Sequence, residues 1–522
     1  MQPQSFARPY KMSTQTYLID TNVIIGLEDH HTVQPAFAAL LSIAAKHKED
    51  VMVHEAARDD IQRDKDAARR TISLSKLEKF QLLRKVRGLS QAELERKFGL
   101  LARPNDVVDA TLLDAIERGV ADFLVTEDRG LHERARRASP ELGRRVLFVA
   151  DAVQLLKTTY EPVEAPVRYV EEVSANEIQL TDEIFDSLRE DYPPFDTWWR
   201  DKCVRERRPC WAVFDEGIAG LVVRKDETAA NTDATIKAPK ILKICTFKVR
   251  PEKRGVKLGE LLLKKVFWFA QANNYDLAYI TTYKTQAALI DLLEYYGFQQ
   301  TATKADGELI YEKTFARGVL APVADMSNFE LDRLNYPRFV TRPGIRAFTV
   351  PIKEGYHDTL YPDLRNPAQQ DLFEAVGIGG GPKRPGNTIR KVYLCRAQSR
   401  LGPPGSLLVF YKGKSQSPPS QALTAVGIFE ESSMASSTKE LMLLTGGRSV
   451  YSEAELSEWK ATADRPVKVI NYLLAAYIEP AIELDELCNL GVIPGHPPQS
   501  IFELSREHLD ALLLRMDLGF AA

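Results

Sequence analysis

Two kinds of apolar spacing alternate along the first 156 residues. Short apolar runs that suit buried strands stand at 16–19, 51–53 and 123–125, and the first and third are each followed closely by an aspartate. Between them the apolar residues recur at helical spacing, as in AFAALLSIAA (36–45) and in the charged stretch 69–101. Alternation of strands and helices is typical of an α/β layer with a parallel sheet, and the pattern closes near VLFVADAVQLL.

The remainder of the chain has a different pattern, with more strands and fewer helices. One amphipathic helix is predicted at 258–274, and strands are predicted on both sides of it, at 211–217, 218–225, 241–249 and 276–283. Further along, strands are predicted at 392–397, 406–413, 422–431 and 467–479, before a final helix at 505–518. This pattern predicts strand-rich segments after residue 170.

Two stretches without apolar periodicity divide the chain. Residues 158–169 contain two prolines, and residues 316–344 are irregular, so both are predicted to be linkers. Domains are then expected at 1–157, 170–315 and 345–522, which agrees with about 100–200 residues per domain. The predicted fold class is α/β multidomain.

Composition adds few constraints. The hydrophobic fraction is 44%, the charged fraction is 27% and the formal net charge is −3, so the overall charge neither indicates nor excludes a nucleic-acid partner. The five cysteines form no close pair, which favours reduced thiols. The sequence has no signal-peptide pattern and no apolar run of about 18 residues, so we expect a cytoplasmic protein with no membrane partner.

Four aspartates of the first segment stand where α/β folds place their ligand sites. Asp20 and Asp128 follow strands, while Asp60 and Asp109 lie near helix starts. Clustered carboxylates repel one another, and a hard divalent ion such as Mg²⁺ or Mn²⁺ relieves that repulsion. The alternative is that each acid caps a helix and binds no metal.

The stretches LIDTNVII, HEAARDDI, VDATLLDAIERGVADFLVTEDRGLH and LFVADAVQLL resemble the core of a PIN domain over about the first 155 residues. The resemblance implies an α/β/α parallel sheet and a metal-dependent ribonuclease. The positions that match its catalytic, metal-binding acids are Asp20, Asp60, Asp109 and Asp128. Asp60 replaces a usual glutamate, with Asp59 as its substitute, and a PIN fold that does not cleave is the alternative.

Four neighbouring polar residues complete the predicted site. Asn22 and Thr126 match residues that order the pocket in the family, while Asp106 and Glu127 are expected either behind the ligands or in solvent.

The loop between the predicted strand 241–249 and the predicted helix at 258 is rich in Arg and Lys and contains Gly255 and Gly259. Backbone N–H groups at a helix start, approached closely through glycines, favour a phosphate or pyrophosphate. Neither a Walker motif nor GxGxxG is present. The alternative is an ordinary strand–turn–helix joint.

Residues 170–315 resemble the GNAT acetyltransferases, a mixed-sheet α+β fold. The resemblance implies that the pyrophosphate of acetyl-CoA binds the six residues Arg254, Gly255, Val256, Lys257, Leu258 and Gly259. The backbone from Phe247 to Val249 would pair with the pantetheine arm. Lys257 departs from the motif glycine. Leu293 stands where the family often has a tyrosine that protonates the departing thiolate, and Tyr295 and Tyr296 lie nearby.

The last segment resembles a PUA-like β-barrel of the ASCH or EVE type, through GSLLVFYKGK, TAVGIFEES, GRSVYSEAELSEW and PPQSIFEL. RNA contacts are predicted from KGK (412–414), Tyr411, Arg448 and Tyr451. The alternative is a solvated loop on a barrel core, and His357 is expected to be a packed or surface residue.

Together these features predict an RNA-directed enzyme that combines a Mg²⁺- or Mn²⁺-dependent ribonuclease with an acetyl-CoA-dependent acetyltransferase. The expected partners are RNA, with tRNA as one candidate, and an antitoxin or other protein, because both folds recur in toxin–antitoxin systems. One alternative is a protein or small-molecule N-acetyltransferase with a docking PIN fold. The other is a non-catalytic RNA-binding regulator.

Overall fold

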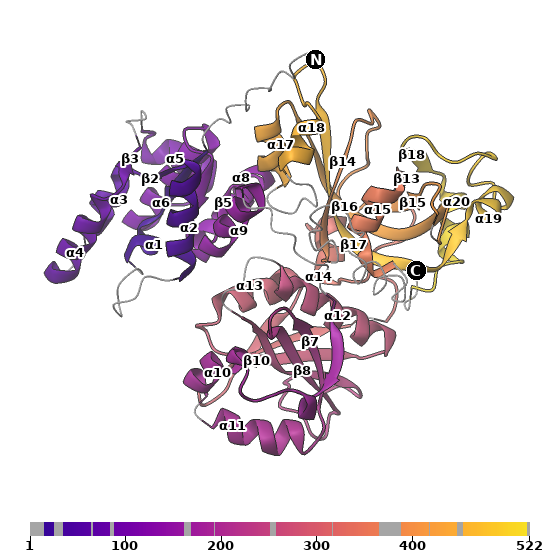
Figure 1. Ribbon diagram of the computed structural model, residues 1–522, viewed down its shortest axis with the longest axis horizontal. Coiled ribbons are helices and arrows are strands. Elements are labelled where there is room, and N and C mark those ends of the chain that lie inside the picture. Colours follow the sequence, from indigo (N-terminus) through magenta and orange to yellow (C-terminus); the bar gives the residue numbers. More distant parts are fainter. Residues whose placement is uncertain are drawn as a thin grey trace, which may run out of the picture. The chain divides into compact units, whose positions relative to one another are not determined.

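The computed structural model forms two compact units (Figure 1). Unit 1 comprises Met1–Val163, Ala435–Gly447 and Ser452–Pro466, and unit 2 comprises Glu164–Met434, Arg448–Tyr451 and Val467–Ala522. The residues that the structure describes are 15–25, 35–63, 66–83, 88–160, 169–192, 194–250, 257–315, 317–364, 388–416, 418–445 and 453–518. None of the helices in these ranges is long and apolar enough to cross a membrane.

Unit 1 is built on a five-stranded parallel sheet in the order β3-β2-β1-β4-β5. The strands are β1 (Thr16–Ile19), β2 (Asp50–Val53), β3 (Gln81–Leu82), β4 (Phe123–Val125) and β5 (Val146–Leu147). The helices are α1 (Thr21–Ile25), α2 (Pro35–His47), α3 (Glu55–Gln62), α4 (Ala67–Leu77), α5 (Gln91–Phe98), α6 (Pro104–Glu117), α7 (Arg129–Ala138), α8 (Pro140–Arg144) and α9 (Val149–Tyr160). The predicted parallel sheet is confirmed, although β3 interrupts the stretch 69–101 that was expected to be helical.

Both faces of the central strands are covered, which explains why β1 is apolar from Tyr17 to Ile19 and β4 is apolar throughout. Successive side chains of a strand point to opposite faces. Tyr17, Ile19 and Val125 accordingly belong to one core cluster, while Leu18 and Leu124 belong to another. All five side chains are fully buried.

Strand order places a ligand crevice between β1 and β4. The chain runs from β1 outward through β2 to β3, and then returns to the other side of β1 to form β4 and β5. This change of direction is the topological switch point of an open α/β sheet, where ligands bind outside the carboxyl ends of the strands.

Two further helices of unit 1 come from far along the chain: α17 (Thr438–Thr445) and α18 (Glu453–Glu458). Lys439 forms a 3.0 Å ion pair with Asp122, which also accepts a hydrogen bond from the Thr16 amide. Leu443 packs against the core cluster that contains Tyr17. The stretch 447–459 had been expected to contribute to the C-terminal barrel, and this expectation is wrong for its second half, which forms α18.

Unit 2 begins with a seven-stranded mixed sheet in the order β11-β12-β10-β9-β8-β7-β6. The strands are β6 (Glu171–Ser174), β7 (Pro209–Phe214), β8 (Ile218–Glu227), β9 (Ile241–Val249), β10 (Leu277–Thr282), β11 (Gln299–Thr303) and β12 (Leu309–Thr314). The associated helices are α10 (Asp186–Asp191), α11 (Phe195–Trp198), α12 (Leu258–Ala272) and α13 (Ala287–Tyr295). Strands β9 and β10 are parallel and the other described neighbours are antiparallel. The predicted amphipathic helix is confirmed as α12.

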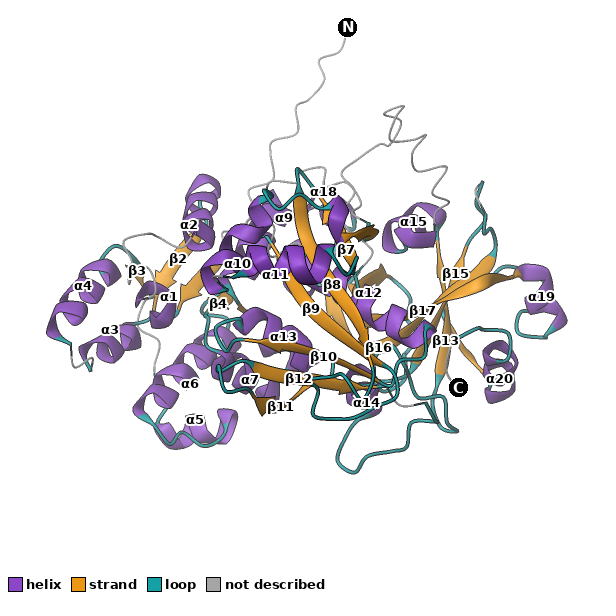
Figure 2. Cartoon of the chain, turned by 90° about the horizontal axis from the view of Figure 1, so that it is seen from below, coloured by secondary structure: helices purple, strands orange, loops and turns teal. Residues whose placement is uncertain are grey.

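The second sheet of unit 2 has six strands in the order β14-β17-β16-β15-β13-β18. Figure 2 labels β13, β15, β16 and β17 among them. They are β13 (Ala347–Ile352), β14 (Arg390–Cys395), β15 (Leu407–Lys412), β16 (Ala422–Ala435), β17 (Val467–Glu483) and β18 (Phe502–Leu504). The helices are α14 (Asn328–Leu334), α15 (Glu354–Leu360), α19 (Leu484–Asn489) and α20 (Arg506–Leu513). The described strands form an open order with β14 and β18 at its ends, so a closed barrel remains a prediction.

One continuous core joins the two sheets of unit 2. The same cluster contains Leu262 and Phe267 of α12, Val409 of β15 and Leu473 of β17. The three-domain division with a linker at 316–344 stays a prediction, beside an observed unit that spans this stretch.

Candidate active sites

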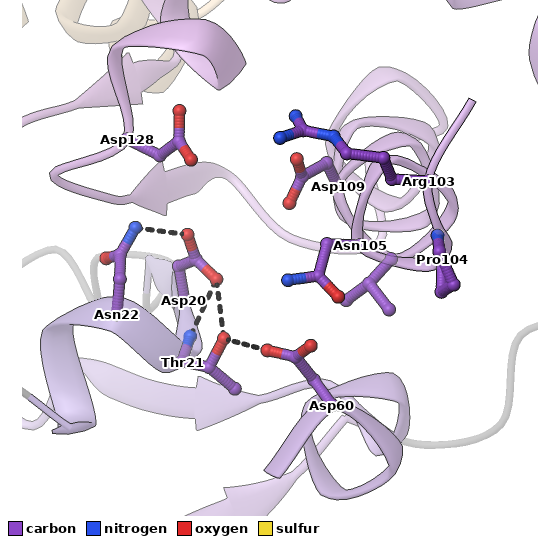
Figure 3. Close-up of a pocket in the computed structure, with 10 residues that line it drawn as sticks. Asp20, Thr21, Asn22, Asp60, Arg103, Pro104, Asn105, Asp109 and Asp128 are labelled. Atoms are coloured by element: carbon purple, nitrogen blue, oxygen red, sulfur yellow. Dashed lines mark hydrogen bonds between the residues drawn. The ribbon is translucent and has the colours of Figure 1, made fainter. Parts of the chain in front are cut away.

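A cavity of about 570 Å³ lies in unit 1, at the edge of the sheet where β1 and β4 end (Figure 3). Its lining residues come from the segments that follow those two strands, including the start of α1, and from α3 and the first turns of α6. They are Asp20, Thr21, Asn22, Asp60, Arg103, Pro104, Asn105, Val108, Asp109 and Asp128. The structure therefore brings the four predicted acids together in one pocket at the switch point of the sheet.

Asp20 lies at the bottom of this pocket with only 4% of its surface exposed. Its carboxylate accepts hydrogen bonds from the Thr126 hydroxyl at 2.6 Å, the Asn22 side-chain amide at 2.8 Å and the Thr21 amide at 2.6 Å. Burial raises the pKa of Asp20 in spite of these hydrogen bonds, and the charge of Asp128 acts in the same direction. A cation beside Asp20 would oppose both effects.

Asn22 and Thr126 order the pocket from one side. The Asn22 side-chain amide also donates to the Thr126 hydroxyl at 3.0 Å, while Asn22 Oδ1 accepts from the Glu127 amide at 3.2 Å. The same Thr126 oxygen accepts from the Asp128 amide at 3.0 Å. Glu127 itself points elsewhere, because its carboxylate accepts from the Val149 amide at 3.0 Å.

Asp109 projects into the pocket from the second turn of α6. Burial raises its pKa to about 7, with the nearby charges of Asp20 and Asp128 adding to the effect. Asp109 does not cap its helix, because the carboxylate of Asp106 accepts from the Arg103 amide at the start of α6. The capping alternative therefore fails for Asp109 and explains Asp106 instead.

Asp128 caps a helix and also lines the pocket. It is the N-cap of α7 and accepts from the Leu131 amide through Oδ1 at 3.1 Å. No ion pair joins Asp128, Asp109 or Asp20 to a described residue. Figure 3 shows Asp128 opposite Asp109, with Asp20 below both.

Asp60 is held at the edge of the pocket. Its two oxygens accept from the Thr21 hydroxyl at 2.9 Å and from the Arg63 guanidinium at 3.0 Å. A partly exposed arginine thus already balances its charge, so Asp60 is the weakest ligand candidate of the four. Asp59, its suggested substitute, is exposed and does not line the cavity.

The donor set of the pocket fits a hard divalent cation, although the side chains are not gathered around one point. In the described part of the chain, no three His, Cys, Asp or Glu side chains stand in a ready-made metal cluster. The pocket nevertheless offers carboxylate oxygens of the type that Mg²⁺ and Mn²⁺ prefer. Burial is the main cause that raises the pKa values of Asp20 and Asp109, and the neighbouring carboxylates add to it.

Two polar pocket residues at the start of α6, Arg103 and Asn105, are among those that the sequence did not predict. Their position is set by the start of α6, which has Pro104 at its first turn and Asp106 at N3. The run RPND carries this helix-start signal, and it places both residues at the end of α6 that carries Asp109.

A second candidate site lies where β9 and β10 separate. Their parallel pairing runs from Leu277–Ile241 to Ile280–Ile244 and ends there. Strand β9 continues to Val249, paired with β8 on its other side. The backbone from Phe247 to Val249 thus borders a wedge between two diverging parallel strands.

The predicted phosphate loop is described only at its end. Arg254, Gly255 and Val256 lie outside the described residues. Lys257 is the N-cap of α12 and has a left-handed backbone with φ 59°, and Leu258 is buried. A Cβ on Gly259 would lie 3.2 Å from Leu292 Cδ2 and 3.9 Å from the Phe247 ring, so this glycine lets α12 pack closely on β9.

The tyrosines and tryptophans near this site are packing residues. Leu293 and Tyr296 are fully buried, and the Tyr295 ring stacks beneath the Arg333 guanidinium at 4.5 Å. In YPPFDTWWRDK, Phe195 and Trp199 belong to a buried core cluster. These side chains therefore contribute to the packing of unit 2.

Two of the candidate RNA contacts of the C-terminal segment are buried. Tyr411 is buried in the common core of unit 2, so its predicted stacking on RNA is wrong. Lys412 is also buried, with a 3.1 Å ion pair to Asp358, and only Lys414 of the KGK run is exposed. Arg448 and Tyr451 lie outside the described residues.

Two polar predictions agree with the structure. His357 is buried and hydrogen-bonded to the Thr424 hydroxyl at 2.7 Å, as a packed histidine. All five cysteines are free thiols, and burial raises the pKa of Cys203 and Cys210 to about 12, which keeps them protonated.

Comparison with known proteins finds similarity to solved structures only. No family model and no curated protein matches the chain. Similar structures include ASCH from Zymomonas mobilis (16% identity, TM-score 0.22, 33% of this chain and 96% of that one). They also include the PaiA N-acetyltransferase of Thermoplasma acidophilum in complex with coenzyme A (14%, 0.23, 28% and 99%) and NAA60 of Arabidopsis thaliana with a bisubstrate analogue (14%, 0.23, 28% and 98%). Similarity at this level identifies no activity, and the functional argument rests on the geometry of the two sites.

Proposed function

We propose that unit 1 is a metal-dependent ribonuclease and that unit 2 is an acetyl-CoA-dependent N-acetyltransferase. The nuclease proposal is carried by one observation: Asp20, Asp109 and Asp128 meet in a pocket at the switch point of a parallel sheet, and none of them forms an ion pair with a described residue. Three carboxylates in this position favour the binding of a cation, since Arg103 is the one basic side chain that lines the pocket.

In this proposal Asp20, Asp109 and Asp128 hold Mg²⁺ or Mn²⁺, with Asp60 at the edge. The bound ion would supply an activated water and stabilise charge on a phosphodiester. The protein's own contribution is orientation. Hydrogen bonds from Thr126 and Asn22 fix the carboxylate of Asp20, and the helix-cap bond fixes that of Asp128.

The test is cleavage of labelled single-stranded RNA in Mg²⁺ or Mn²⁺, with and without a chelator. We expect Asp109→Asn and Asp128→Asn to abolish cleavage, while Asp59→Asn, an exposed neighbour outside the pocket, retains it. Mg²⁺ should also raise the melting temperature of the wild type and not that of Asp109→Asn. Equal cleavage by all variants would point to a contaminant, and the absence of both effects would support a PIN fold that only docks partners.

The acetyltransferase proposal is carried by the wedge between β9 and β10. Unpaired strand edge from Phe247 to Val249 can hydrogen-bond an extended amide chain such as pantetheine. The start of α12, a 15-residue helix, directs backbone N–H groups and a positive dipole end towards a pyrophosphate. In the reaction the acetyl carbon forms a bond to an amine nitrogen as its bond to sulfur breaks, and the amine proton leaves with the thiolate or with water.

Isothermal titration with acetyl-CoA tests this site. Lys257→Glu places a negative charge at the helix start and should weaken binding at least tenfold. Lys265→Glu, two turns along the same helix, makes the same charge change away from the loop and should leave binding unchanged. No heat and no thermal stabilisation with the wild type would remove the proposal.

We propose RNA as the substrate class that the two units share, with tRNA as a candidate acceptor and an antitoxin or other protein as a further partner. The support is chemical: a carboxylate–metal pocket acts on phosphodiesters, and an amine acceptor can be carried by a charged tRNA. Acetyl transfer to a peptide amine in the absence of RNA cleavage would favour the protein-acetyltransferase alternative. RNA binding with neither activity would favour a regulator.

A further inference from the structure

The pocket of unit 1 contains a single cation among its ten lining residues. Four of the ten are aspartates, and Arg103 is the one basic side chain. The phosphates of a nucleic acid that approaches this pocket are repelled by its four carboxylates. A metal ion can offset the charge at the phosphate being cleaved, but the neighbouring phosphate needs a positive group of its own.

Arg103 is fixed by a carboxylate that is itself buried. Asp106, with 5% of its surface exposed, accepts from the Arg103 amide and from its guanidinium, each at 2.9 Å. The Arg134 guanidinium lies 3.8 Å from the same carboxylate and helps to balance it. The backbone and side chain of Arg103 are therefore both tied to the first turn of α6.

The Arg103 guanidinium remains open to ligands despite this anchor. Its side chain is 79% exposed, and one of its five N–H donors is engaged by Asp106. Figure 3 shows the guanidinium beside Asp109 at the rim of the pocket. An exposed planar fork with a fixed base suits a phosphate, which arginine binds through two donors at once.

We propose that Arg103 is a phosphate-positioning residue that binds the non-bridging oxygens of the phosphate next to the one that is cleaved. This inference rests on the proposed nuclease function of the same pocket. Arg103 would set the register of the RNA strand and would not touch the reacting atoms. Its contribution is then to binding and orientation.

The same helix supplies a matched control. At the opposite end of α6, Arg118 forms a 3.1 Å ion pair with Asp114, and it lies about 20 Å from Arg103 along a helix of 14 residues. Arg118 thus has the same kind of helix-end pairing and does not line the cavity. If Arg103 were only a helix-end ion pair, the two arginines would respond alike to substitution.

The experiment measures binding of a fluorescent single-stranded RNA by anisotropy, in chelator, over a range of NaCl concentrations. The full chain is used as wild type, Arg103→Ala, Arg103→Lys and Arg118→Ala. Loss of one phosphate contact should lower the slope of log affinity against log salt by about 0.7, which corresponds to about fivefold weaker binding at about 0.1 M salt. We expect this for Arg103→Ala alone, with the slope restored by Arg103→Lys because lysine keeps the charge.

Cleavage kinetics in Mg²⁺ separate this role from the nuclease proposal. Arg103→Ala should raise KM about fivefold and leave the kcat of the bound complex within about twofold, since a binding contact is lost and no reacting group. If the wild type binds RNA, Arg103→Ala shows the expected lower slope, and no protein cleaves RNA, then the nuclease proposal is refuted and the phosphate contact of Arg103 is supported. An unchanged slope for Arg103→Ala, an equal change for Arg118→Ala, or no RNA binding by the wild type would overturn the inference.

Discussion

The ion pair between Glu260 and Arg390 should be among the most costly contacts to break in unit 2. Glu260 lies in the first turn of α12 and is 3% exposed, and Arg390 begins β14 of the second sheet. The carboxylate accepts from the Arg390 amide at 2.6 Å and from its guanidinium at 2.9 Å. These contacts lower the pKa of Glu260, whose burial alone would raise it.

Removal of Arg390 leaves the buried Glu260 carboxylate without its counter-charge, whereas removal of Glu260 leaves an arginine side chain that is 27% exposed. We therefore expect Arg390→Met to lower the free energy of unfolding of unit 2 by about 3–5 kcal/mol, and Glu260→Gln to lower it by less. The loss should exceed that of an ordinary hydrogen bond, because the Glu260 carboxylate would stay desolvated. The double variant Glu260→Leu/Arg390→Met removes both charges and should cost less than the sum of the two single variants by about 2 kcal/mol or more.

The assay is urea unfolding of the four proteins, followed by tryptophan fluorescence, with the coupling energy taken from the cycle. Arg346 and Glu503 give a matched control in the same unit. That pair is bidentate at 2.6 Å but exposed by 43% and 45%, so its coupling should stay within about 1 kcal/mol. Equal coupling in both cycles, or additive losses at Glu260 and Arg390, would refute the argument that burial makes this pair strong.

Two further predictions concern pH and the helices that join unit 1. Asp332 is fully buried, and burial raises its pKa to about 8, so its native form keeps a proton that the unfolded chain loses. Stability of unit 2 should therefore fall as pH rises from about 4 to about 8, by up to about 1.4 kcal/mol per pH unit. Asp332→Asn, which can still accept from the Val340 amide, should remove this slope in urea unfolding, and a persistent slope would contradict it. Lys439→Glu replaces the ammonium group that lies 3.0 Å from Asp122 with a negative charge. It should destabilise unit 1 by about 1 kcal/mol in thermal unfolding, more than Lys439→Met does, and equal losses would show that the charge is irrelevant.

The pocket acids could be predicted from the sequence because parallel strands impose a simple rule. Asp20 and Asp128 follow strands that run in the same direction, so both reach the same edge of the sheet. Asp109 follows from the helix-start signal at Pro104, which places the early turns of α6 at that edge. The weakness of Asp60 could not be predicted in this way, because it depends on how the flexible side chain of Arg63 lies.

The interface between the two sheets of unit 2 could not be predicted from the sequence, for a physical reason. Polar residues of a helix are expected to face solvent, yet Glu260, Lys264 and Trp268 of α12 are held by partners from the C-terminal part of the chain. Lys264 pairs with Asp363 at 2.6 Å, and the Trp268 N–H donates to the Tyr336 hydroxyl at 2.9 Å. Charged helix residues give the same sequence pattern whether they form buried ion pairs or face solvent, so the sequence does not distinguish the two cases.

The helices α17 and α18 explain why unit 1 has no simple boundary in the sequence. Strands β16 and β17 are neighbours in the sheet of unit 2, but the chain between them contributes helices to unit 1. Leu441, Leu444 and Leu456 of those helices are buried there. A fragment that ends at residue 163 would lose this apolar cover and expose the surface beneath it. Unit 1 therefore acquires all of its helices only when the C-terminal part of the chain has been made. We expect the folding of unit 1, which contains the proposed nuclease pocket, to depend on the segment between β16 and β17.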